Sequence, residues 1–195
     1  MSLTESEFTA LRATIASRGT VRMVLLPVIV IGWAALAIVV VLFGDLPVAA
    51  LPPLAILAAG FETINALHVG VERIGRYLQV YYEGTAELPA WETTAMGAAP
   101  RLRGGVDPLF TVVFAAVAIL NMTTALVPEP TPLETLMIGG FHAAFLIRIA
   151  RARQQASSQR ARDLRAFQEH ASARRAVSNE PDLPRPRAPF PSAES

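Results

Sequence analysis

The sequence predicts an all-α protein: a four-transmembrane-helix bundle with an N-terminal interfacial amphipathic helix and cytoplasmic helix extensions. Apolar residues make up 52% of its 195 residues. Four stretches contain no charged residue: 24–44, 46–61, 108–128 and 135–147. The longest of these reach the roughly 20 residues that an α-helix needs to cross a hydrocarbon core about 30 Å thick. The chain has no cysteine, which excludes disulfides and thiol chemistry.

Residues 1–20 are expected to form a short amphipathic helix. Thr4 and Glu7 have the spacing of a capping box, and Gly19 is a residue type suited to ending a helix. Three apolar side chains share one face of this helix: Phe8, Leu11 and Ile15. We therefore expect it to lie on the bilayer surface.

The transmembrane bundle is expected at residues 21–153, and its four spans at about 21–43, 49–83, 108–128 and 132–153. Prolines stand near the starts of the last three spans, where a missing N–H costs least. Thr131 and Glu134 repeat the capping-box spacing before the fourth span. The second span is longer than a bilayer core is thick, so its last third should project beyond the membrane.

The remaining segments are predicted to be cytoplasmic. They comprise a loop at 84–107, an arginine-rich helix at 154–177 and a disordered tail at 178–195, which has five prolines and no periodicity. The short turns at 44–47 and 128–134 contain no arginine. The positive-inside rule therefore predicts a multi-pass protein of the bacterial inner membrane with both termini in the cytoplasm.

A polar stripe about 140° wide follows one face of the second helix as it leaves the membrane. Its polar members are Glu62, Asn65, His68, Glu72, Arg73, Arg76, Gln79 and Glu83. The group His68, Glu72, Arg73 and Arg76 is expected at the cytoplasmic edge. Glu72 and Arg76 have the i, i+4 spacing of a helix-surface ion pair.

A second polar group is expected inside the membrane. Glu62 lies ten residues after Pro52 and His142 ten residues after Pro132, so each should be about 15 Å from the outer end of its helix. We expect these two side chains to meet near the bilayer midplane, together with Asn65, Asn121 and Thr124. Such a cluster either holds the helices in register or forms a proton relay or cation site.

No cofactor or metal site is predicted. A haem held by two histidines needs ligands at similar depth, but His68 should lie about 9 Å deeper than His142. No Glu-x-x-His pairs of the di-metal type occur. No catalytic residue is assigned, because the phosphate-loop, nucleophile-elbow and zinc-protease signatures are missing.

Three function classes follow from these patterns. The leading hypothesis is a non-enzymatic accessory or scaffold subunit whose cytoplasmic helix extensions dock a partner, either a membrane-complex protein or another copy of the chain. The alternative is a proton- or cation-coupled transport element that uses Glu62 and His142. The third is a metal-dependent membrane enzyme that uses His68. The arginines predict contact with anionic lipids at the cytoplasmic face of the bilayer rather than with nucleic acid.

Overall fold

The computed structural model describes residues 3–82, 108–126 and 129–178. The loop predicted at 84–107 lies outside the described residues, as does the tail predicted at 178–195 apart from Ser178. All the regular secondary structure that the described residues form is helical, so the predicted all-α class is confirmed.

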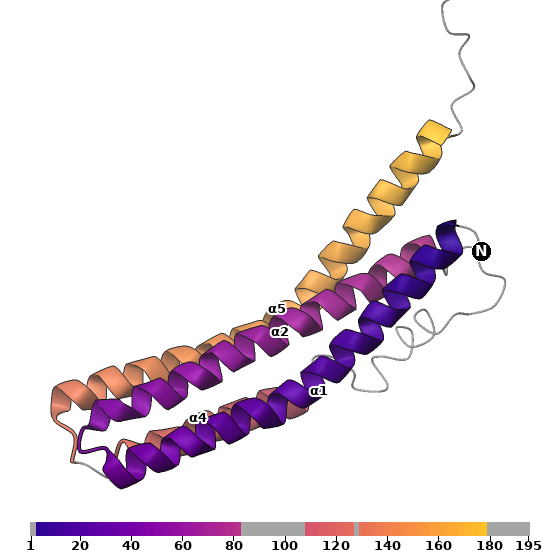
Figure 1. Ribbon diagram of the computed structural model, residues 1–195. Coiled ribbons are helices and arrows are strands. Elements are labelled where there is room, and N and C mark those ends of the chain that lie inside the picture. Colours follow the sequence, from indigo (N-terminus) through magenta and orange to yellow (C-terminus); the bar gives the residue numbers. More distant parts are fainter. Residues whose placement is uncertain (1–2, 83–107, 127–128, 179–195) are drawn as a thin grey trace, which may run out of the picture.

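The described chain forms four α-helices and one short 3-10 helix. They are α1 (Leu3–Phe43), the 3-10 helix η1 (Pro47–Ala50), α2 (Leu51–Tyr81), α4 (Pro108–Thr124) and α5 (Pro132–Ser178). Figure 1 shows that α1 and α2 form one antiparallel hairpin, and that α4 and α5 form a second one beside it. Both hairpin connections lie at the same end of the molecule, here called the hairpin end. The opposite end, where α1 begins and α5 ends, is called the distal end.

Three of the helices, α1, α2 and α5, are long and apolar enough to cross a membrane. Helix α4 is also apolar, but its 17 residues extend only about 25 Å. Three of the predicted spans thus correspond to helices that could cross a membrane, while the four-span bundle stays a prediction. Large apolar side chains point outward from the bundle on these helices, among them Ile31, Ile38, Leu42, Ile119 and Leu136.

The structure has no helix end at Gly19, so the helix predicted at residues 1–20 is not separate from the first span. Helix α1 continues through Gly19 without interruption into the apolar segment. The cause is packing near the start of α1, where Phe8 and Tyr82 bring their ring centroids to 5.5 Å and Tyr77 donates a hydrogen bond to Glu7 at 3.0 Å. These contacts hold the first turns of α1 against the distal end of α2, and they outweigh the modest helix-breaking preference of one glycine.

The start of α5 follows the predicted capping box. The backbone N–H of Thr131 donates to the Glu134 carboxylate at 2.9 Å, and the Glu134 N–H faces the Thr131 hydroxyl oxygen at 3.4 Å. From Pro132 onward, the predicted fourth span and the predicted arginine-rich helix form one continuous helix. In Figure 1, the C-terminal part of α5 turns away from the line of α2.

An aromatic layer forms the middle of the core. Phe61 of α2 makes edge-to-face contacts with Phe114 of α4 and Phe145 of α5, with ring centroids 5.5 and 5.9 Å apart. Next to this layer α1 approaches α2 so closely that a Cβ atom on Gly60 would lie 2.6 Å from the side chain of Ile29. A residue without a side chain is therefore required at position 60 for this helix crossing.

Candidate functional site

A closed hydrogen-bond network, here called the hairpin-end cluster, ties α1, η1, α4 and α5 together. Asn121 and His142 are 0% and 2% exposed. The indole N–H of Trp33 donates to the Asn121 side-chain oxygen at 2.9 Å. The Asn121 amide nitrogen lies 3.0 Å from the carbonyl oxygen of Ala50 and 3.1 Å from His142 Nε2. His142 Nδ1 lies 2.8 Å from the carbonyl oxygen of Ile138.

These contacts fix the tautomer of His142. A carbonyl oxygen only accepts, so Nδ1 carries the proton and Nε2 accepts from the Asn121 amide. A second proton on His142 would place an N–H donor against the Asn121 amide donor. His142 therefore accepts one hydrogen bond and donates another, and the hairpin-end cluster joins the elements that carry Trp33, Asn121 and His142. Trp33 is a further member that no sequence pattern indicated, although a buried indole N–H usually needs a partner.

Glu62 does not join this cluster. Its carboxylate accepts a hydrogen bond from Arg148 at 2.7 Å, and the two side chains are 50% and 40% exposed. Because Phe61 and Phe145 are level, Glu62 lies about 6 Å deeper along the bundle than His142. Glu62 also follows the buried Phe61 by one residue and points about 100° away from it. The Thr124 hydroxyl bonds the Asn121 carbonyl of its own helix at 2.7 Å. The pair that the transport hypothesis requires, Glu62 with His142, is thus not formed.

A second polar group, the ion-pair cluster, surrounds Arg76 towards the distal end. Arg76 is 1% exposed; it donates to Asp163 of α5 at 2.7 Å and makes a short hydrogen bond to Glu72. Arg160 of α5 donates to the other oxygen of Glu72 at 3.2 Å. Arg73 approaches Asp163 at 3.6 Å from a more exposed position. The cluster therefore joins α2 to α5 through alternating charges.

The ion-pair cluster also reaches α1. Arg22 Nη1 lies 2.6 Å from His68 Nδ1, and His68 Nε2 lies 3.7 Å from Glu72. Because a guanidinium group only donates, His68 Nδ1 accepts and its other nitrogen carries the proton that faces Glu72. Of the predicted edge group, His68, Glu72, Arg73 and Arg76 all take part. Three further members were not indicated by any sequence pattern: Arg22, Arg160 and Asp163.

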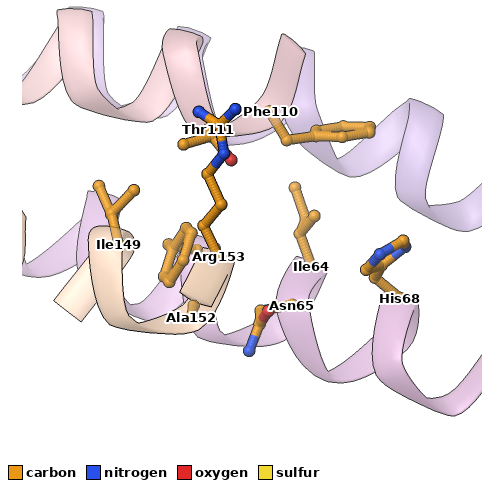
Figure 2. Close-up of a pocket in the computed structure, with 9 residues that line it drawn as sticks. Ile64, Asn65, His68, Phe110, Thr111, Ile149, Ala152 and Arg153 are labelled. Atoms are coloured by element: carbon orange, nitrogen blue, oxygen red, sulfur yellow. The ribbon is translucent and has the colours of Figure 1, made fainter. Parts of the chain in front are cut away.

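Two small cavities lie beside the ion-pair cluster. Figure 2 shows the first, where Arg153 of α5 reaches toward Thr111 of α4, and where Asn65 and His68 project from α2. Its volume is about 20 Å³, and a neighbouring cavity, which also contacts Asn65 and His68, measures about 40 Å³. Volumes of this size hold single water molecules rather than a substrate. Asn65 thus lies at these cavities instead of in the hairpin-end cluster.

The aromatic layer separates these cavities from the hairpin-end cluster. Phe61, Phe114 and Phe145 are 6%, 0% and 7% exposed, so they fill the space between α2, α4 and α5 with apolar atoms. The two polar groups therefore do not connect across this layer within one copy of the chain. In the part of the chain that the structure describes, no three His, Asp or Glu side chains converge into a potential metal site.

No protein-family model matches the chain, and neither does any curated protein or solved structure.

Proposed function

We propose that this chain is a non-enzymatic scaffold or accessory subunit of the bacterial inner membrane. In this proposal, a rigid cytoplasmic stalk made of α1, α2 and α5 presents basic side chains to a partner protein. The observation that carries the proposal is the ion-pair cluster, which joins all three helices around the buried guanidinium of Arg76. Buried charges that are paired on several sides fix the relative positions of the helices that carry them.

The proposed topology places the hairpin end outside the membrane and the distal end in the cytoplasm. The described hairpin connections carry no arginine, while the distal halves of α1, α2 and α5 are rich in it. This is the asymmetry of the positive-inside rule. In this orientation α4 is a short fourth span, and the ion-pair cluster lies at the cytoplasmic boundary of the bilayer.

The distal half of α5 has a basic surface. Its exposed arginines are Arg151, Arg153, Arg162, Arg165 and Arg174. By the helical rise, Arg165 lies about 3 Å and Arg174 about 16 Å beyond Asp163, which belongs to the ion-pair cluster at the proposed bilayer boundary. The potential of anionic lipids falls off within a Debye length of about 8 Å at physiological salt. Lipids therefore account for the arginines up to Arg165, whereas Arg174 favours an acidic surface on a partner protein.

Native mass spectrometry of protein extracted gently from its own membrane tests this proposal. We expect a second polypeptide to accompany the chain, and we expect the charge reversal Arg174→Glu to remove it. The matched control is Arg165→Glu, which makes the same charge change within reach of the lipids and should retain the partner. Recovery of the chain only with itself or with lipid would refute the scaffold proposal.

A further inference from the structure

An apolar groove runs along the outside of the bundle between α2 and α5. Its volume is about 440 Å³, which is within the size range of ligand and partner sites. We call it the α2–α5 groove. The residues that line it are Leu51, Leu54, Ala55, Ala58, Glu62, Phe141, Ala144, Phe145 and Arg148.

One end of the α2–α5 groove is formed by an ion pair that lies at the depth of the hydrocarbon core. Glu62 lies eleven residues after Leu51, about 16 Å along α2, which is close to the middle of a hydrocarbon core about 30 Å thick. Among the described residues, Glu62 and Arg148 form the one ion pair in which both side chains are at least 40% exposed. A half-exposed ion pair facing lipid tails is costly, so polar groups should cover it.

We propose that the α2–α5 groove is a dimer interface that binds the same groove of a second copy. Copies inserted in the same orientation are related by a two-fold axis parallel to the helices. That axis places α2 of one copy against α5 of the other. Glu62 of each copy then faces Arg148 of the other copy at the same depth. The groove is thus complementary in charge to itself.

The groove is also complementary in shape to itself. Phe141 on α5 is 55% exposed, whereas α2 presents the small side chains of Ala55 and Ala58. The contact between Phe61 and Phe145 sets the relative level of the two helices. Ala58 precedes Phe61 by three residues and Phe141 precedes Phe145 by four, so Ala58 and Phe141 lie at nearly equal depth. In the dimer, the Phe141 ring of each copy therefore packs on the alanines of the other.

A lipid fits this groove less well than a second copy does. An acyl chain could fill the apolar part, but it offers no hydrogen bond to Glu62 or Arg148. A phospholipid headgroup could offer one, but it lies at the bilayer surface rather than near its middle. The positions of the charges therefore select the second copy over a lipid.

Complementary charge reversals test the dimer in liposomes, with single-molecule photobleaching as the readout. We expect the wild-type chain to dimerise, and both Glu62→Arg and Arg148→Glu to weaken homodimers by about tenfold or more, because each puts like charges opposite each other. A mixture of the two variants should dimerise again, since each copy then supplies the charge that the other lacks. If the ion pair acts only within one copy, dimerisation will not recover in the mixture, and that result would overturn the proposal.

Cysteine cross-linking gives a second test in chains that keep the ion pair. The chain has no cysteine of its own, so Ala58→Cys in one tagged copy and Phe141→Cys in another can be examined without background. We expect this combination to form a disulfide between copies. Ile119→Cys, which is on α4 and 59% exposed, is the control and should not cross-link. A wild-type chain that stays monomeric at every lipid dilution, with or without a bound lipid, would overturn the dimer and leave the scaffold proposal untouched.

Discussion

Arg76 on α2 and Asp163 on α5 are 87 positions apart in the chain, and their side chains meet at a distance of 2.7 Å. Arg76 is 1% exposed and also bonds Glu72 on its own helix. The guanidinium group is thus almost completely buried, while the Glu72 and Asp163 side chains around it are 18% and 16% exposed. The contact therefore joins α2 to α5 at the centre of the ion-pair cluster.

The first prediction is that Arg76→Ala destabilises the protein by about 3 to 5 kcal/mol, the usual cost of leaving a buried charge without its partner. The measurement is thermal or denaturant unfolding in detergent micelles. Arg73→Ala is the matched control, because Arg73 is 56% exposed and lies 3.6 Å from Asp163. We expect that change to cost less than about 1 kcal/mol. Equal effects of the two variants would show that Arg76 is not the centre of the cluster.

The second prediction concerns the hairpin-end cluster. Asn121→Leu removes the partners of Trp33, of the Ala50 carbonyl and of His142 at once. Polar interactions between membrane helices are worth roughly 0.6 kcal/mol each, so we expect a loss of about 2 kcal/mol in unfolding free energy. Thr124→Val should change it by less than about 0.5 kcal/mol, because the Thr124 hydroxyl bonds only within α4. Unchanged stability of Asn121→Leu would show that the hairpin-end cluster does not hold the helices together.

Local signals in the sequence predicted the helices well. The uncharged stretches located the helices, and Thr131 with Glu134 located the start of α5. Each of these signals depends on a few neighbouring residues, so it can be interpreted without knowing which distant residues pack against them. The same locality explains the error at Gly19. A break there was expected from one residue, but contacts with α2, more than 60 positions away, decide that α1 continues.

The candidate sites were harder to predict because they depend on helix rotation and on distant partners. Counting residues along each helix predicts equal depth for Glu62 and His142, but the contact between Phe61 and Phe145 places Glu62 about 6 Å deeper. Counting also does not say which way each side chain points. Phe61 and Phe145 take the inward positions, so Glu62 is turned toward Arg148 instead. Asp163 could not be predicted as a site residue for the same reason. It stands among arginines in the sequence, and nothing nearby marks it as the partner of Arg76.

The third prediction uses the contact between the start of α1 and the end of α2. A hydrogen bond to the Glu7 carboxylate, together with burial and the negative charge of Glu7, raises the pKa of Tyr82 to about 12. The neutral phenol is the donor, so this contact contributes its full stability below the ordinary pKa near 10. The contribution is lost as the pH rises toward 12. The first turns of α1 should therefore stay docked at neutral pH and detach in strong base.

Glu7→Gln should lower the pKa of Tyr82 toward 10. The measurement is an absorbance titration of the phenolate in a Tyr77→Phe/Tyr81→Phe background, which leaves Tyr82 as the single tyrosine of the chain. That background with Glu7 intact is the control. Titration of Tyr82 near 10 in both proteins would mean that Glu7 does not hold the phenol.

The last prediction tests how closely α1 and α2 pack. A Cβ atom on Gly60 would lie 2.6 Å from the side chain of Ile29, so Gly60→Ala should destabilise the protein by about 1 to 3 kcal/mol through overpacking. Gly139 on α5 provides the control, since a Cβ there meets nothing within 4 Å. Gly139→Ala should stabilise α5 slightly, by up to about 1 kcal/mol, because alanine favours the helix. Adding Ile29→Ala to Gly60→Ala should recover part of the loss by making room for the new methyl group. If Gly60→Ala is as well tolerated as Gly139→Ala in unfolding measurements, the two helices do not cross at this distance.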